Sequence, residues 1–227
     1  MKPDVLDEHF YMSAEKSLSD ANHYDKADRN GPKIFVGEWA TREGSPTPNL
    51  QSALGDAAWM TGMERNSDII VLASYAPLFV NVNPGGMQWP SDLIGYDALN
   101  SYGSPSYHAQ VMFNEHLGDH VLDSKLDATN PRLFESVTVD SKRHRVIVKL
   151  VNGSSHPQAV KIELSGAKGV HSKAALTTLS ALTMEATNSI TNPTRIVPVV
   201  SSIANAAPTF THTVPAYAIQ ILDLDLN

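Results

Sequence analysis

The period of the apolar pattern changes once along this chain, near residues 118–132. Before that point, strand-like apolar runs alternate with amphipathic stretches of about helical length, and after it apolar residues recur at every second position. Strands that alternate with helices indicate a parallel sheet covered by helices, whereas closely spaced short strands indicate an antiparallel sandwich. The sequence therefore predicts an α/β part over residues 1–120 and an all-β part over residues 121–227.

The first part follows a β-α-β-α-β pattern. Strand-like runs cover residues 5–11, 33–40 and 68–81, and the stretches of helical length between them cover residues 13–29 and 49–65. The second helix has one face with apolar spacing, made by Leu50, Ala53, Leu54, Ala57, Ala58 and Thr61. Asn49 is its predicted N-cap, and Gly55 and Gly62 allow close packing on a sheet. One more helix is predicted over 104–118.

Three parallel strands are too few for a closed barrel, which needs eight strand–helix units and about 250 residues. No GxGxxG loop follows the first strand, so the sequence lacks the motif that is typical of a dinucleotide-binding sheet. We therefore expect a partial (β/α)8 barrel, made of the last three strand–helix units, followed by an antiparallel β-sandwich. The strands predicted for the sandwich are 133–140, 145–152, 158–166, 173–180, 195–200 and 216–226.

Composition excludes several classes of function. The net charge is −7 and no basic stripe is present, so nucleic acid is not an expected partner. Cysteine is absent, which removes disulfides and thiolate chemistry. The N-terminus lacks the apolar run of a signal peptide and no run of about 18 uncharged apolar residues occurs, so the chain is expected to be soluble, without a membrane partner.

Other common motifs are missing as well. The histidines form no HExxH, and His116 and His120, although four residues apart, make no compelling metal-ligand pattern. No GxSxG elbow or phosphate loop occurs. We therefore predict no metal and no cofactor.

Polar and aromatic residues follow the predicted strands where each strand ends, which is the edge at which barrels place their reacting groups. The first strand ends with His9 and Tyr11 on one face and Phe10 on the other, and the second ends with Glu38 and Trp39. The third ends near Tyr75, with Asn81 beyond it.

Each of these residues has an ordinary explanation: a solvated or salt-bridged Glu38, a packing Trp39 and a satisfied His9 near the rim. Together they suit a sugar, because carboxylates cleave the glycosidic bond, aromatic faces hold the ring, and an imidazole and a phenol orient the reacting groups.

Several stretches resemble α-L-arabinofuranosidases of glycoside hydrolase family 51, of the type found in plants and many bacteria. These stretches are LDEHFY, GPKIFVGEWA, LGDAAWMTGMERNSDIIVLASYAPLFVNVN, WPSDLIGYDA and GSPSYHAQVMF, with VKLVNGSSHPQAVKIELSG, NPTRIVP and VPAYAIQIL later in the chain. The resemblance covers essentially all 227 residues and corresponds to the distal part of the family's sequence.

The resemblance implies a retaining mechanism on a (β/α)8 barrel joined to a β-sandwich, with an arabinose-containing oligo- or polysaccharide as the substrate. It makes Glu38, in the motif FVGEWA, the nucleophile. It places His9 and Tyr11 in the same pocket, with Tyr11 bonded to the nucleophile and His9 holding the sugar. Asn81 and Trp89 are further pocket candidates with a looser motif match.

The family's general acid/base, a Glu in an Asn-Glu-Pro-type motif, has no counterpart here. Glu8, Glu43, Glu64 and Glu115 do not stand in that context. Two interpretations therefore stay open: a chain that carries the nucleophile half of a glycosidase site, and a catalytically incomplete carbohydrate-binding or assembly module. An incomplete barrel also leaves a sheet edge to cover, and association with a second copy of the chain would cover it.

Overall fold

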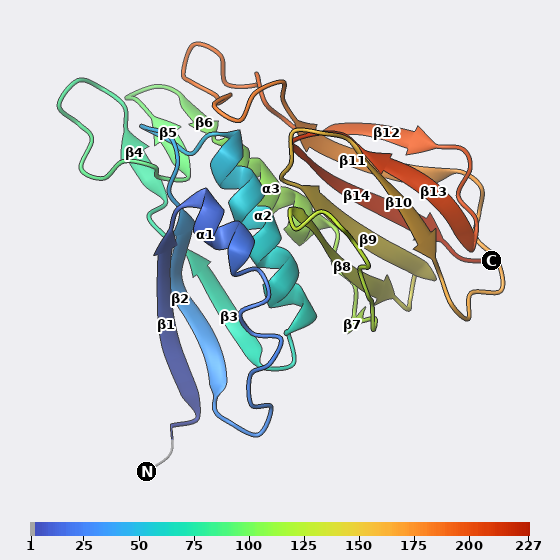
Figure 1. Ribbon diagram of the computed structural model, residues 1–227. Coiled ribbons are helices and arrows are strands. Elements are labelled where there is room, and N and C mark those ends of the chain that lie inside the picture. Colours follow the sequence, from blue (N-terminus) through green and yellow to red (C-terminus); the bar gives the residue numbers. More distant parts are fainter. Residues whose placement is uncertain (1–2) are drawn as a thin grey trace.

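A parallel sheet leads into antiparallel sheets, as predicted (Figure 1). The computed structural model describes residues 3–227. Its first three strands are β1 (Val5–Met12), β2 (Lys33–Thr41) and β3 (Ile70–Tyr75), which form a parallel sheet in the order β1-β2-β3. Their carboxyl ends lie at one edge, because parallel strands run in the same direction.

Helix α2 (Leu50–Arg65) confirms the predicted central helix, including its N-cap. The Asn49 side chain accepts a hydrogen bond from the Ser52 N–H at 3.1 Å. The helix is buried almost all round, and not on one face alone, because it lies between the parallel sheet and strands of the antiparallel part (Figure 1). Its two glycines permit this packing, since a Cβ at position 62 would lie 2.0 Å from the carbonyl oxygen of Ala21.

The first predicted helix is much shorter than its pattern suggested. Helix α1 covers Ala14–Ser19 alone, and the rest of the stretch 13–29 consists mainly of turns. Asp and Asn recur in this stretch, and their side chains favour turns over helix interiors. Helix α3 (Pro105–Glu115), with Ser104 as its N-cap, agrees with the helix predicted over 104–118.

The strand-like run 68–81 is not one strand. It divides into β3, which ends at Tyr75, and β4 (Phe79–Asn81), because Pro77 lacks the N–H that would continue the ladder. Strand β4 pairs with β5 (Ile94–Tyr96), which pairs with β6 (Ser101–Gly103). The sequence did not predict this small sheet, whose strands have three residues each.

The second part contains a six-stranded sheet of order β12-β11-β14-β9-β8-β7 and a two-stranded sheet, β10-β13. Its elements are β7 (His120–Val121), β8 (Leu133–Asp140), β9 (Arg145–Asn152), β10 (Gln158–Glu163), β11 (Ala174–Ser180), β12 (Val199–Ile203), β13 (Thr209–Val214) and β14 (Ala218–Asp225). The strand predicted over 195–200 is displaced toward the C-terminus, since β12 begins just after Pro198. Strands β7 and β13 were not predicted.

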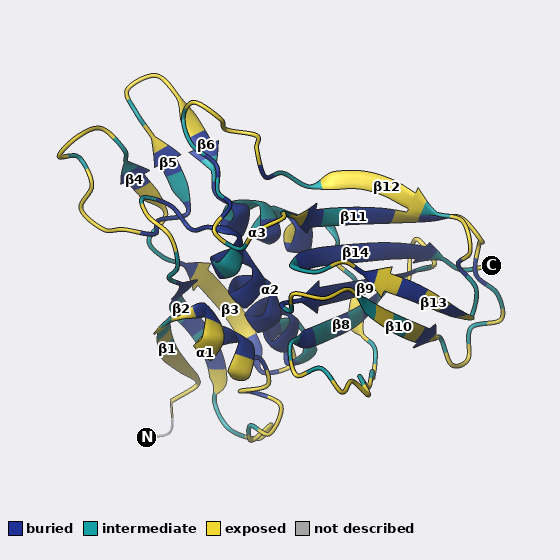
Figure 2. Cartoon of the chain, turned by 45° about the horizontal axis from the view of Figure 1, so that its top comes forward, coloured by how far each residue is buried: buried dark blue, intermediate teal, exposed yellow. Residues whose placement is uncertain are grey.

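One apolar core joins the two parts (Figure 2). It extends from Val36 on β2 through α2 and α3 to Ile147 on β9 and Ile219 on β14. A second core fills the space between the two antiparallel sheets. Within residues 3–227, no helix is both long and apolar enough to cross a membrane.

Candidate active site

Tyr11 and Glu38 form a hydrogen bond across neighbouring strands at the carboxyl edge of the parallel sheet. The Tyr11 hydroxyl donates to Oε2 of Glu38 at 2.6 Å, and Nδ1 of His9 lies 3.7 Å from the same oxygen. Phe10 points to the other face, where its ring packs against the ring of Trp59 with centroids 5.1 Å apart. His9, Tyr11 and Glu38 thus share one face, and the Glu38 side chain keeps 46% of its surface exposed.

A β-bulge directs Glu38 to this face. Strand β1 pairs Glu8 with Val36 and then His9 with Glu38, so Gly37 is an extra residue on β2. Strict alternation would place Glu38 on the same face as Val36, which is fully buried in the core. The extra residue reverses the alternation, which is the usual effect of a bulge on the side chain that follows it.

The environment of Tyr11 keeps its hydroxyl protonated. Burial, followed by the hydrogen bond to Glu38 and the Glu38 charge, raises the pKa of Tyr11 to about 12. The Arg42 guanidinium lies 5.5 Å from the centre of the Tyr11 ring and donates from Nη2 to the Pro90 carbonyl at 2.8 Å. Arg42 was not predicted as a site residue, although it follows the second strand end closely.

Trp39 is not brought to this face. It is 3% exposed in the core, and its ring packs edge-on against Tyr75 with centroids 5.3 Å apart. The bulge explains the placement, because Val36 and Trp39 both point into the core while Glu38 between them points away. This position gives Trp39 a packing role beneath the strand end.

Trp89 and Asn81 belong to the segment that follows β3. Trp89 is 62% exposed, and it precedes the Pro90 carbonyl that Arg42 holds. The Asn81 side chain accepts a hydrogen bond from the Asn83 N–H at 3.1 Å and so shapes the start of the loop. Arg42 therefore links this loop to the ring of Tyr11.

The other glutamates noted in the sequence occupy different surroundings. Glu8 accepts a hydrogen bond from the Tyr24 hydroxyl at 2.7 Å, and Glu43 accepts one from the Ala14 N–H at 3.2 Å. Glu64 pairs with Lys149, and Glu115 is exposed at the end of α3. Glu8, Glu43 and Glu64 are thus engaged away from Glu38.

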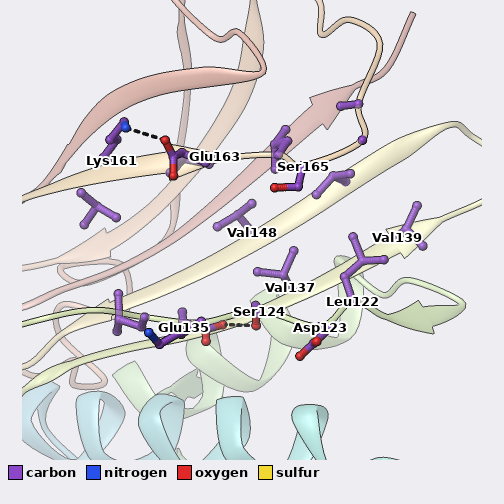
Figure 3. A pocket seen from close by; sticks show the side chains of 18 of the residues that line it. Leu122, Asp123, Ser124, Glu135, Val137, Val139, Val148, Lys161, Glu163 and Ser165 are labelled. Carbon is purple, nitrogen blue, oxygen red and sulfur yellow. Dashed lines mark hydrogen bonds and ion pairs between the residues drawn. The ribbon is translucent and has the colours of Figure 1, made fainter.

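A hollow lies elsewhere, between β8, β9 and β10 (Figure 3). It has a volume of about 660 Å³, and Val137, Val139 and Val148 are among its apolar lining residues. Its rim carries the ion pair Lys161–Glu163. None of its lining residues is aromatic, so it offers no ring face for stacking a sugar. Within residues 3–227, no three His, Asp or Glu side chains are grouped closely enough to hold a metal.

Comparison with known proteins agrees with the order of parallel and antiparallel strands. Residues 9–218 match the family described as the α-L-arabinofuranosidase C-terminal domain. The chain belongs to this family. It is 32% identical over 97% of its length to α-L-arabinofuranosidase 1 of Arabidopsis thaliana, of which it covers 33%. It is 33% identical to α-L-arabinofuranosidase A of Aspergillus kawachii, with 96% of this chain and 33% of that protein covered.

Solved structures of the family agree with the fold. The arabinose-bound structure of the GH51 α-L-arabinofuranosidase named MgGH51 superposes with a TM-score of 0.92 at 35% identity, over 99% of this chain and 37% of that chain. An arabinose complex of the Thermotoga maritima enzyme shares the fold at a TM-score of 0.81 and 18% identity, over 98% of this chain and 53% of that chain. This family member thus spans about a third of the length of the curated relatives it matches.

Proposed function

We propose that this chain carries the nucleophile half of a retaining α-L-arabinofuranosidase site, with Glu38 as the nucleophile. The complete site would release terminal non-reducing α-L-arabinofuranosyl residues from arabinose-containing oligo- and polysaccharides. The observation that supports this most is the 2.6 Å hydrogen bond from Tyr11 to Glu38 at the carboxyl edge of the parallel strands. Reacting groups of barrel enzymes lie at that edge.

In this mechanism, one oxygen of Glu38 is held and the other attacks. Oε2 accepts the Tyr11 hydroxyl, which leaves Oε1 to attack the anomeric carbon of the sugar. The new ester bond forms as the glycosidic bond breaks and its electron pair goes to the leaving oxygen. Water then cleaves the ester, which regenerates the Glu38 carboxylate.

A retaining glycosidase also needs a second carboxyl group, about 5–5.5 Å from the nucleophile, to protonate the leaving oxygen and later to activate water. Glu8, Glu43 and Glu64 are held in other contacts. We therefore expect the 227-residue chain to depend on a leaving group that departs without protonation, because losing an acid/base typically costs about 10²–10⁴-fold in rate.

The test uses 4-nitrophenyl α-L-arabinofuranoside, whose nitrophenolate leaving group scarcely needs an acid. We expect the chain to release nitrophenolate and Glu38→Gln to abolish the release. Glu115→Gln makes the same change at an exposed glutamate of α3 and is expected to keep the wild-type rate. An unchanged rate in Glu38→Gln would contradict the assignment of the nucleophile.

The alternative, a carbohydrate-binding or assembly module, makes a different prediction for the same samples. A chain with a cooperative unfolding transition that binds arabino-oligosaccharide without cleaving the nitrophenyl glycoside would support that alternative. Strand β3 is at the edge of the parallel sheet, and its Val71 and Leu72 side chains are exposed. Exposed apolar side chains on an edge strand favour an assembly module over a carbohydrate-binding module. Light scattering at the working concentration separates a monomer from a self-associated chain.

A further inference from the structure

Asp7 lies on the same face of β1 as His9, two residues earlier in the strand. Its Oδ2 is 3.2 Å from Nε2 of His9, while Nδ1 of the same ring is 3.7 Å from Oε2 of Glu38. The imidazole therefore lies between two carboxylates from neighbouring strands. An ionised carboxylate can accept hydrogen bonds but cannot donate them, so the hydrogen of the Asp7–His9 contact belongs to Nε2.

Gly37 makes room for the Asp7 carboxylate. A Cβ at residue 37 would lie 2.0 Å from Oδ1 of Asp7 and 2.9 Å from its Cγ, closer than real Cβ contacts come. Gly37 is also the extra residue of the bulge that directs Glu38 to this face. The same position thus orients Glu38 and admits the acid that contacts His9.

We propose that Asp7 is a positioning residue of the sugar pocket, which accepts the Nε2 hydrogen of His9 and thereby turns Nδ1 toward Glu38. The hydrogen bond at one ring nitrogen of a histidine decides which nitrogen is left for chemistry. Nδ1 can then accept a hydrogen bond from a sugar hydroxyl, or donate one when the ring is protonated. The catalytic meaning of this contact rests on the proposed function, but the contact itself does not.

The groups around the ring come from two strands. Asp7 and Tyr11 face it from β1, and Glu38 faces it from β2, with Arg42 beyond on the ring of Tyr11. In a neutral imidazole only one nitrogen carries a hydrogen, and the Asp7 carboxylate favours Nε2 as that nitrogen. Removing this acceptor is therefore expected to lower the share of the Nε2–H tautomer of His9.

The experiment measures the tautomer of the neutral His9 ring in the ¹⁵N-labelled 227-residue chain by long-range ¹H–¹⁵N NMR at alkaline pH, with His9→Gln identifying the His9 signals. Asp7→Ala removes the acceptor, so the share of the Nε2–H tautomer should fall. Gly37→Ala keeps Asp7 but displaces its carboxylate, so it should lower that share as well. Asp4→Ala makes the same change at an exposed residue just before β1 and should leave that share unchanged.

An unchanged His9 tautomer in folded Asp7→Ala, or an equal change in Asp4→Ala, would overturn the proposal. The NMR result stands whether or not the chain cleaves a glycoside, so it is distinguishable from a failure of the proposed function. If nitrophenyl arabinofuranoside is cleaved, Asp7→Ala should also lower kcat/KM several-fold.

Discussion

Lys149 is fully buried on β9, and its ammonium group pairs with Glu64 near the C-terminal end of α2. The Ser136 hydroxyl on β8 donates to the other Glu64 oxygen at 2.5 Å. Nζ of Lys149 also lies 5.0 Å from the centre of the Phe113 ring on α3. The pair thus connects both long helices to the antiparallel sheet.

Breaking this pair should destabilise the whole chain. Lys149→Met leaves the Glu64 carboxylate, whose side chain is 14% exposed, without its cation. Breaking a buried ion pair typically costs about 3–5 kcal/mol. Urea unfolding of the variant is expected to show that loss, and the double variant Lys149→Met/Glu64→Leu should recover much of it. Lys161→Met breaks an exposed pair with Glu163 and should cost less than about 1 kcal/mol. Equal losses in the two single variants would contradict a special role for the buried pair.

Tyr11→Phe should impair cleavage while leaving the fold intact. It removes the donor to Glu38, and a hydrogen bond to a charged group contributes about 1.5–3 kcal/mol, so kcat/KM on the nitrophenyl glycoside should fall by about 10–100-fold. Tyr24→Phe is the matched control, because Tyr24 donates to Glu8 in the same way outside the Glu38 site. Equal activity of Tyr11→Phe and Tyr24→Phe would show that the hydrogen bond from Tyr11 to Glu38 does not contribute to cleavage.

Trp89 should report on sugar binding. It is 62% exposed, whereas Trp39 and Trp59, the other two tryptophans, are 3% and 2% exposed. Acrylamide quenching therefore comes mainly from Trp89, and an arabino-oligosaccharide that covers its ring should reduce the quenching constant. Trp89→Phe should remove the effect, and a glucose-based oligosaccharide should not produce it. Quenching that is insensitive to arabino-oligosaccharide would exclude Trp89 from the proposed sugar site.

Asp56 should make stability fall as pH rises. It is fully buried on α2, where Oδ1 accepts the Thr41 N–H at 2.8 Å, and burial raises its pKa from 3.8 to about 7. Between these values the folded chain holds a proton that the unfolded chain has lost, so the free energy of unfolding decreases with rising pH.

Asp56→Asn should therefore flatten the dependence of stability on pH between about 4 and 7, by on the order of 2–4 kcal/mol. Chemical unfolding at several pH values measures the slope. Asp4→Asn, at an exposed position, is expected to keep the wild-type slope. If the free energy of unfolding of Asp56→Asn falls with pH as steeply as that of the wild type, Asp56 does not cause the pH dependence.

Local signals in the sequence predicted the elements that depend on local interactions. The N-cap and length of α2 follow from Asn49 and the apolar spacing after it. The shared face of His9 and Tyr11 follows from strand alternation within β1. The pattern over residues 13–29 failed, because recurrent Asp and Asn residues favour turns after the short helix α1.

The sequence by itself determined the order of parallel and antiparallel strands, the central helix, the family and the strand-end position of Glu38. Only the tertiary structure decided the direction in which Glu38 points, because the bulge at Gly37 is a matter of register between β1 and β2. The same bulge directs Trp39 into the core and places Gly37 next to the Asp7 carboxylate, where a larger side chain would not fit. Period and capping are properties of one segment, whereas register is fixed by a partner strand far away in the sequence.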